Sequence, residues 1–537
     1  MSLNKINIRS FFFSITTFIA ITILFSSCAQ IVPLTGGEKD IESPKELESS
    51  PQNGSTLFNS ETVTIQFDEY IKLTNISSQL IVSPLMETPP EVMVKGKKLV
   101  IKLKSELAPN TTYSLNFGNA ISDITENNVY PNYKYVFSTG DYIDSLSYSG
   151  TVINAFDATP KENIYVLLYD QFEDSVPLKE LPRYVALTNK KGEFSITNIA
   201  QGDYKLFAIN DVNSNYLFDL PNEAIGFKND AVSIQKSDTN SFVYLFEEEN
   251  DLQFLVNSEY KSYGKIDLIF NKPTQELSIS ILNNEEKENW SVIEKNDTKD
   301  SITIWLYPEF IDKEIDLLVK DQNEIIDTLN FDLITPNQFK DSVVSVKSNA
   351  SGSFDLNKNV ILKTNRPFKS YRSENIKLYE DSNLVSKNNF SDIDLRAFEL
   401  AYDFKENTPY QLLLLPNSFE DIYGLKNDTV KVNFKTKKVS DYGVINLAIN
   451  PNFSENYIIQ LFKGKQLVSE KFLSGNQTQQ YKYLSPGAYS LKLIVDKNND
   501  KKWNTGNYLK GLQPEKVIIY QKEIKIRANW DNDINWT

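Results

Sequence analysis

The sequence contains no histidine in 537 residues, and its single cysteine is Cys28. Without histidine, the chain cannot form a Ser-His-Asp or Cys-His catalytic group, or a metal site that needs imidazole. A single cysteine excludes an intramolecular disulfide and a cluster of thiolate ligands. The chemistry that remains is that of carboxylates and of cations held by oxygen atoms, such as calcium.

Positive charge is also scarce, with 56 Lys and Arg residues against 71 Asp and Glu residues and a net charge of −15. No run of basic residues interrupts this balance. Such a chain binds nucleic acid poorly, so no nucleic-acid partner is expected. An anionic lipid surface would also repel it, and attachment to a membrane therefore requires a separate anchor.

The first 27 residues have the three parts of a secretory signal peptide. Two basic residues come first, an apolar run follows over residues 11–25, and small residues precede Cys28. The apolar run is shorter than the roughly 20 residues of a membrane-spanning helix. The segment resembles the signal of bacterial lipoproteins, although Phe25 stands where leucine is usual. This resemblance implies that Cys28 is acylated and becomes the mature N-terminus; the alternative is a chance cysteine beside an ordinary cleavage site.

Short segments of alternating apolar and polar residues run through the rest of the chain. Examples are residues 63–67, 113–117 and 489–493, and turns rich in Asn, Asp, Gly and Pro separate them. Strands of about five residues at a spacing of about 8–12 residues predict β-sandwiches. No long stretch has a helical period. The predicted fold class is therefore all-β, a string of small β-sandwich domains.

The chain also repeats itself. Residues 107–117 and 404–414 share the pattern Asn-Thr-x-Tyr within a predicted strand, and their segments close on Phe137-Ser-Thr and Phe434-Lys-Thr. Each copy carries an Asp-Ile pair in between, at Asp123 and Asp421. A second pattern, Gly-x-Tyr-x-Leu, begins at Gly202 and again at Gly487. Repeated segments indicate repeated domains.

The repeats predict the order of domains. The boundaries are 1–27 for the signal peptide, 28–41 for a linker after the lipidated cysteine, 42–140 for an Ig-like domain, 145–235 for a prealbumin-like sandwich, 245–343 for a sandwich of the Ig-like kind, 345–437 for the second clear Ig-like repeat, and 441–537 for the second prealbumin-like sandwich.

Two families are similar to these segments. Residues 42–140, with the sequences Pro51-x-Asn-Gly-Ser and Phe137-Ser-Thr-Gly, resemble the bacterial Ig-like domain of surface-layer proteins. Residues 145–235, with Gly150-Thr-Val and Gly202-x-Tyr-x-Leu, resemble the prealbumin-like sandwich of carboxypeptidase regulatory domains. The whole arrangement is similar to envelope lipoproteins of the Bacteroidota. These resemblances imply a fold and a location in the cell envelope, and they do not imply an enzyme.

Two loops are candidates for calcium binding. Each follows a Gly-x-Tyr-x-Leu strand and places oxygen-bearing side chains at positions 1, 3, 5 and 9, a spacing with which a tight loop wraps Ca²⁺. Both depart from the EF-hand pattern, because position 6 lacks glycine, and the second loop also lacks a nearby glutamate. An Asx-rich turn without metal explains the same residues. The candidate ligands are Asp211, Asn213, Asn215, Asp219 and Glu223 in the first loop, and Asp496, Asn498, Asp500 and Asn504 in the second.

Two serines are candidates for O-glycosylation. Ser145 and Ser342 each stand between an aspartate and an aliphatic residue, a triplet that resembles the glycosylation signal of Bacteroidota envelope proteins. Both fall at predicted domain junctions, where a sugar is tolerated.

Three functions fit these patterns. The preferred one is a non-enzymatic, lipid-anchored scaffold that binds other envelope proteins or glycans. The first alternative is a carbohydrate-binding lipoprotein that uses some of its five tryptophans. The second is a carboxylate-dependent hydrolase, but neighbouring acids such as Asp68 and Glu69 point to opposite faces of a strand. Because residues 29–32 lack the acidic residues of surface-export signals, we expect the periplasmic face of the outer membrane.

Overall fold

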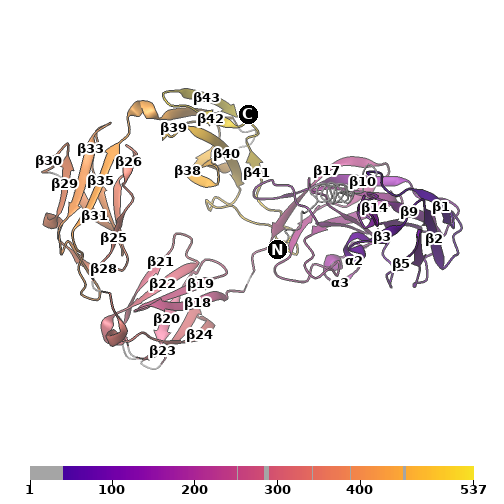
Figure 1. Cartoon of the computed structure of the whole chain (residues 1–537), viewed down its shortest axis with the longest axis horizontal. Helices are drawn as coiled ribbons and strands as arrows, with labels where there is room; N and C mark the ends of the chain where they lie inside the picture. The colour runs from indigo at the N-terminus through magenta and orange to yellow at the C-terminus, as the bar shows by residue number, and fades with distance from the viewer. Residues whose placement is uncertain are drawn as a thin grey trace, which may run out of the picture. The chain divides into compact units, whose positions relative to one another are not determined.

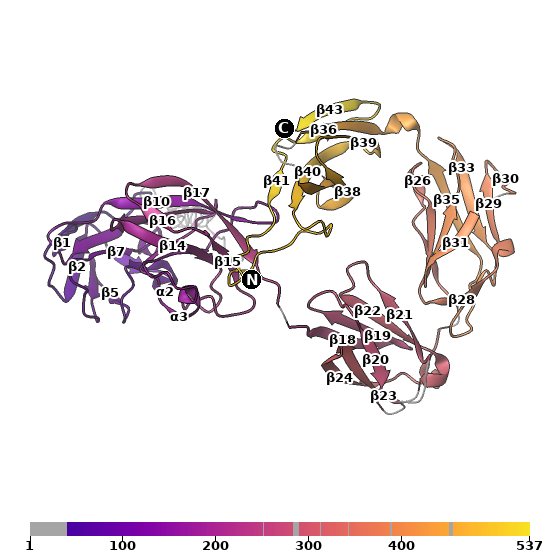
Figure 2. The same ribbon diagram turned by 180° about the vertical axis from the view of Figure 1, so that it is seen from behind.

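The computed structural model describes residues 40–250, 252–282, 289–311, 313–341, 343–386, 389–450 and 455–536. Strands make up nearly all of its regular structure, as Figure 1 and the reverse view in Figure 2 show. The prediction of an all-β chain of small sandwiches is confirmed. Within the described ranges, none of the helices is long and apolar enough to cross a membrane. Cys28 and Ser342 lie outside the described residues.

The chain divides into two compact units. Among the described residues, the first contains 40–146 together with 183–185 and 197–201, and the second contains the remainder. The first sandwich lies in the first unit, and its sheets have the orders β1-β2-β6-β5, β4-β7-β9 and β3-β8. Its core includes Ile65, Phe67 and Phe117, which are inaccessible to solvent. Its elements are β1 (Glu46–Ser50), β2 (Thr62–Phe67), β3 (Ile71–Leu73), α2 (Ile76–Gln79), β4 (Ile81–Ser83), β5 (Glu91–Lys95), β6 (Lys98–Lys102), β7 (Thr112–Asn116), β8 (Ile121–Asp123) and β9 (Lys134–Ser138).

The second sandwich has one continuous strand path, β12-β11-β14-β15-β17-β10-β13, with β16 paired to β14. The path includes β17, which runs parallel to β10. This strand lies beyond residue 235, where the sequence places the end of the domain. The elements are β10 (Leu146–Asn154), β11 (Tyr165–Tyr169), α3 (Val176–Lys179), β12 (Tyr184–Leu187), β13 (Glu193–Ile199), β14 (Gly202–Ile209), β15 (Ala224–Phe227), β16 (Val232–Ile234) and β17 (Asp238–Glu247).

The third sandwich shares the four-stranded and three-stranded sheets of the first, without a counterpart of β3-β8 among its described strands. Its four-stranded sheet, β18-β19-β22-β21, again joins two consecutive strands to a hairpin, and a sheet β20-β23-β24 lies in the same domain. Leu268, Ile304 and Leu317 are buried in its core. The elements are β18 (Leu255–Ser262), β19 (Lys265–Phe270), β20 (Ser278–Ile281), β21 (Ser291–Lys295), β22 (Ser301–Leu306), η1 (Pro308–Phe310), β23 (Glu314–Asp321), β24 (Glu324–Asp332) and η2 (Pro336–Gln338).

The fourth sandwich has sheets β25-β27-β32-β31, β26-β35-β33-β29-β30 and β28-β34. Both figures show β29, β33 and β35 side by side. The elements are β25 (Val346–Ser348), β26 (Gly352–Phe354), β27 (Val360–Thr364), β28 (Phe368–Tyr371), η3 (Ser373–Asn375), β29 (Ile376–Glu380), β30 (Asn383–Leu384), β31 (Asn389–Asp394), β32 (Ala397–Ala401), β33 (Pro409–Leu414), β34 (Phe419–Asp421), β35 (Val430–Thr436) and η4 (Val439–Asp441).

The repeated residues of the first and fourth sandwiches make the same hydrogen bonds. The hydroxyl of Tyr113 accepts the backbone N–H of Ala108 at 2.9 Å, and that of Tyr410 accepts the N–H of Lys405 at 2.9 Å. Asp123 in the first sandwich and Asp421 in the fourth are both inaccessible to solvent. Each accepts backbone N–H groups of the loop that follows it. Buried polar atoms require such partners, which explains why these residue types recur.

The fifth sandwich has sheets β39-β36-β43 and β38-β37-β40-β41, with β42 paired to β40. Strand β40 carries the second Gly-x-Tyr-x-Leu pattern, as β14 carries the first. The elements are β36 (Gly443–Ile449), β37 (Asn456–Lys463), β38 (Gln466–Ser474), β39 (Gln477–Leu484), β40 (Gly487–Asp496), β41 (Val517–Ile519), β42 (Ile524–Ile526) and β43 (Asp531–Trp536).

An ion pair joins the third and fourth sandwiches. The guanidinium of Arg396 donates two hydrogen bonds to the carboxylate of Glu294, at 2.7 and 2.5 Å. The indole N–H of Trp305 donates to the same carboxylate at 3.0 Å, and the guanidinium lies 5.5 Å from the centre of the Trp305 ring. Burial alone would raise the pKa of Glu294, but the bonds from Arg396 and Trp305 outweigh it and lower the pKa below 4.5. Bidentate, largely buried pairs of this kind fix geometry.

We expect Arg396→Ala to destabilise this junction by about 1–2 kcal/mol, because it leaves a largely buried carboxylate without its cation. Calorimetry of the mature chain would measure the loss, and a double-mutant cycle with Glu294→Gln would isolate the pair. Because the folded-state pKa of Glu294 is depressed, the stabilisation is complete above the ordinary value of 4.5 and is lost as pH falls through the folded-state pKa.

A matched control is Lys261→Ala, which removes an exposed ion pair with Glu259 within the third sandwich. Its effect should stay below about 1 kcal/mol. Equal effects of Arg396→Ala and Lys261→Ala would contradict a fixed junction.

Candidate functional site

The first Asx-rich loop follows β14 and is closed by carboxylates. Asp211 accepts the backbone N–H groups of Asn215 and Tyr216, at 3.2 and 2.7 Å. Asp219 accepts the side-chain amides of Asn213 and Asn215, at 3.1 and 2.9 Å. The structure therefore brings the four predicted residues together in one loop, where carboxylate oxygens face amide donors.

Glu223 forms the base of this loop. It is 1% exposed, and its carboxylate accepts the backbone N–H groups of Val212, Asp219 and Leu220 at 3.0–3.1 Å. A carboxylate with three backbone donors ties the two ends of a loop together.

The second Asx-rich loop follows β40 and has a similar arrangement, but the carboxylate that accepts the side-chain amides is at position 5 instead of position 9. Asp496 accepts the N–H groups of Asp500 and Lys501, at 3.2 and 3.0 Å. The side-chain amides of Asn498 and Asn504 both donate to Asp500, at 3.1 and 2.9 Å. Burial opposes ionisation of Asp500, but the amide and backbone donors outweigh it and lower its pKa. The carbonyl oxygen of the Asn504 side chain is buried and, among the described residues, has no hydrogen-bond partner.

The second loop does have a glutamate at its base, which the sequence interpretation missed. Glu515 accepts the N–H of Lys497 at 2.8 Å and that of Asn504 at 3.1 Å. These donors occupy the positions that Val212 and Asp219 hold in the first loop. Burial, and then the charges of Asp496 and Asp500, raise the pKa of Glu515. A longer excursion of the chain separates this glutamate from its loop, so spacing gave no signal for it.

The backbone of both loops takes the left-handed conformation at two equivalent positions. The φ angles are 61° at Ser214 and Tyr216, 61° at Asn499 and 65° at Lys501. Tyr216 and Lys501 are the sixth residues of their loops, where an EF-hand has glycine. The side chain changes, but the backbone conformation that glycine favours is present. Within the described ranges, no three His, Cys, Asp or Glu side chains group as metal ligands, and calcium binding by Asp and Asn oxygens stays a prediction.

The other predicted residues lie apart from these loops. Ser145 is exposed directly before β10. Trp290 and Trp305 are buried in the third sandwich, and Trp530 is the tryptophan with the greatest exposure among the described residues, at 59%. The side chain of Trp503 donates to the backbone oxygen of Glu515. The tryptophans therefore do not form a common platform for a sugar.

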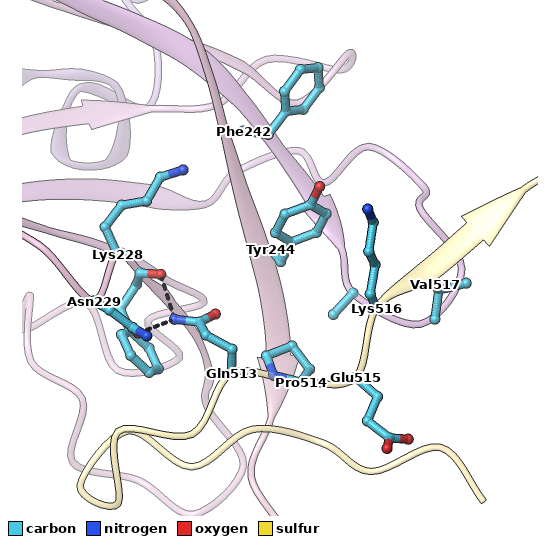
Figure 3. A pocket seen from close by; sticks show the side chains of 11 residues that line it. Lys228, Asn229, Phe242, Tyr244, Gln513, Pro514, Glu515, Lys516 and Val517 are labelled. Carbon is cyan, nitrogen blue, oxygen red and sulfur yellow. Dashed lines mark hydrogen bonds between the residues drawn. The ribbon is translucent and has the colours of Figure 1, made fainter. Parts of the chain in front are cut away.

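Residues 505–517 of the fifth sandwich contact the second sandwich, within the same compact unit. The ring of Tyr508 packs against Phe207 and Phe227, with centroid distances of 5.1 Å to each. The side-chain amide of Gln513 donates to the backbone oxygen of Phe227 at 3.0 Å and to Asn229 at 2.8 Å, as the dashed lines in Figure 3 show. A pocket with a volume of about 410 Å³ lies beside this contact.

Comparison with known proteins identifies the first sandwich. Residues 40–139 match the bacterial Ig-like domain. The match extends over the first sandwich and confirms that the Ig-like resemblance holds there. No curated protein matches the chain.

Several solved structures match this chain with low sequence identity and low TM-scores. A surface-layer protein, rSbsC, is 10% identical with a TM-score of 0.14, covering 90% of this chain and 67% of its own. An I-band fragment of titin is 9% identical with a TM-score of 0.14, covering 53% and 99%. The major pilin subunit of Bacillus cereus is 6% identical with a TM-score of 0.13, covering 73% and 98%. Similarities at these scores do not indicate a function for this chain.

Proposed function

We propose that this chain is a non-enzymatic scaffold of the cell envelope, anchored through a lipid on Cys28 in the outer membrane and facing the periplasm. Its sandwiches would hold envelope proteins or glycans at a fixed spacing from the membrane. The observation that carries the proposal is the junction between the third and fourth sandwiches. There, Arg396, Glu294 and Trp305 form a largely buried contact between consecutive domains.

A second junction contact supports the same role. The guanidinium of Arg366 in the fourth sandwich lies 4.9 Å from the ring centre of Phe339 and 5.7 Å from that of Tyr423. The Tyr423 hydroxyl also donates to the backbone oxygen of Gly264 in the third sandwich, at 3.3 Å. Contacts between neighbouring domains restrict their relative motion, which a scaffold of defined spacing requires.

Crosslinking in intact cells followed by mass spectrometry tests this proposal. We expect the anchored protein to crosslink to a small set of envelope proteins or glycans through several of its sandwiches. The variant Cys28→Ser, expressed at the same level, is the control because it lacks the anchor. The same crosslinked partners in both cases, or turnover of a glycoside abolished by one acid substitution, would overturn the scaffold function.

A further inference from the structure

Strand β17 presents a row of aromatic side chains on its outer face. Phe242, Tyr244 and Phe246 alternate with the buried residues Val243 and Leu245. The neighbouring segment covers the last of the three, because a Cβ atom at Gly506 would lie 2.5 Å from its ring. The first two remain 51% and 44% exposed. Adjacent aromatic rings left uncovered by the fold mark a binding surface.

The pocket of about 410 Å³ opens on these two rings. Figure 3 shows the side chains of Lys228 and Lys516 on either side of Tyr244. Glu515 also contributes to the wall, but its carboxylate is turned away and is held by the N–H groups of Lys497 and Asn504. A pocket of this size, with apolar walls and a few polar groups, is typical of a site for a small molecule.

The charge of the pocket is opposite to that of the chain. The net charge of the protein is −15, yet the charges free to face a ligand here are the two lysine ammonium groups. Within the described residues, neither ammonium group has an ion pair with a carboxylate. Lys228 is half-buried, and this burial lowers its pKa. The two ammonium groups together favour an anionic ligand in the pocket.

We propose that this pocket binds a small, ring-bearing carboxylate, whose ring lies against Phe242 and Tyr244 and whose negative charge is attracted by Lys228 and Lys516. The hydrocarbon face of a pyranose and the face of a benzene ring both pack on aromatic side chains. A hexuronic acid and an aromatic acid therefore share the chemistry that the pocket recognises. This site goes beyond the scaffold function and does not depend on it.

Isothermal titration of the full mature chain tests the proposal. The probes are a disaccharide of galacturonic acid and 3-phenylpropionate, each in buffer with EDTA so that no divalent cation bridges ligand and protein. The α-1,4-linked disaccharide of galactose and 3-phenylpropanol are their uncharged counterparts. We expect saturable binding of at least one acid, and binding of its uncharged counterpart to be weaker by about tenfold or more. Tighter binding of the disaccharide would identify a sugar acid as the ligand, and the reverse would identify an aromatic acid.

Variants locate the site. Lys228→Met and Phe242→Ala should each weaken binding of the preferred acid by about tenfold, because each removes one element of recognition. The matched controls are Lys522→Met, an exposed lysine, and Phe472→Ala, a phenylalanine with 47% exposure on β38. All four side chains are at least partly exposed, so the melting temperatures should stay near that of the unsubstituted chain.

Three outcomes would overturn the proposal. The first is no saturable binding of either acid at millimolar concentration. The second is equal binding of the acids and their uncharged counterparts. The third is binding that Lys228→Met and Phe242→Ala weaken no more than the control variants do. If Lys228→Met changes the melting curve, Lys516→Met on the opposite side of Tyr244 replaces it, with the same expected loss.

Discussion

The variant Cys28→Ser is expected to lose its lipid anchor, so that any cleaved protein leaves the membrane fraction. Cys28 follows a basic region, an apolar run and small residues, and it is the one cysteine of the chain. The remaining sequence is acidic, so an anionic lipid surface would repel it. Stable attachment requires more than one acyl chain, and a modified N-terminal cysteine supplies them. Without the cysteine, the chain should be soluble after cleavage or remain an uncleaved precursor.

Membrane fractionation with mass spectrometry of the mature N-terminus measures this result. The unsubstituted protein should carry the mass of the acyl groups on Cys28. The control is Ser27→Ala, which keeps a small residue before the cysteine and should be lipidated normally. A Cys28→Ser protein that stays in the membrane pellet with an unmodified mature N-terminus would contradict the lipoprotein assignment.

Calcium is expected to raise the melting temperature of the mature chain through the first Asx-rich loop. An ion bound by the oxygens of Asp211, Asn213, Asn215 and Asp219 would bind the folded state alone. At a free concentration of 100 times the dissociation constant, the free energy of unfolding should rise by about 2.7 kcal/mol. Magnesium should have a smaller effect, because it requires short bonds in a near-ideal octahedral geometry, which a flexible loop of oxygen ligands provides poorly.

Asp219→Asn is the sharpest test of this site. The Asp219 carboxylate accepts side-chain amides only, so the substitution leaves intact the backbone bonds that Asp211 and Glu223 accept. The substitution should abolish most of the rise in melting temperature that calcium causes, while the melting temperature in EDTA should change little. Asp230→Asn, an exposed acid outside the loop, is the control and should keep the shift. Identical melting curves in millimolar calcium and in EDTA would show that the loop is only a turn.

Local patterns were sufficient to predict the fold, because each sandwich is built from short strands with turn residues between them. The repeats were informative for a physical reason. Tyr113 and Tyr410 occupy equivalent positions since each must satisfy a backbone N–H at the same turn.

Contacts between distant segments could not be predicted in this way. Glu515 closes a loop that ends well before it in the chain, and no spacing rule connects the two. Arg396 and Glu294 lie on different sandwiches, so neither has a local signal. Phe242 and Tyr244 lie in a strand whose residues are apolar on both faces, and the alternation that distinguishes inside from outside is absent.

Glu515 also links the second Asx-rich loop to the pocket beside Tyr244. Its carboxylate closes the second Asx-rich loop, and the same residue forms part of the pocket wall beside Lys516. A ligand that fixes the position of Glu515 in the loop would therefore also affect the pocket wall, and the reverse. If a cation in that loop tightens binding in the pocket by some factor, a ligand in the pocket must tighten cation binding by the same factor. If both sites are occupied as predicted, the fifth sandwich would couple the binding of an ion to the binding of a small molecule.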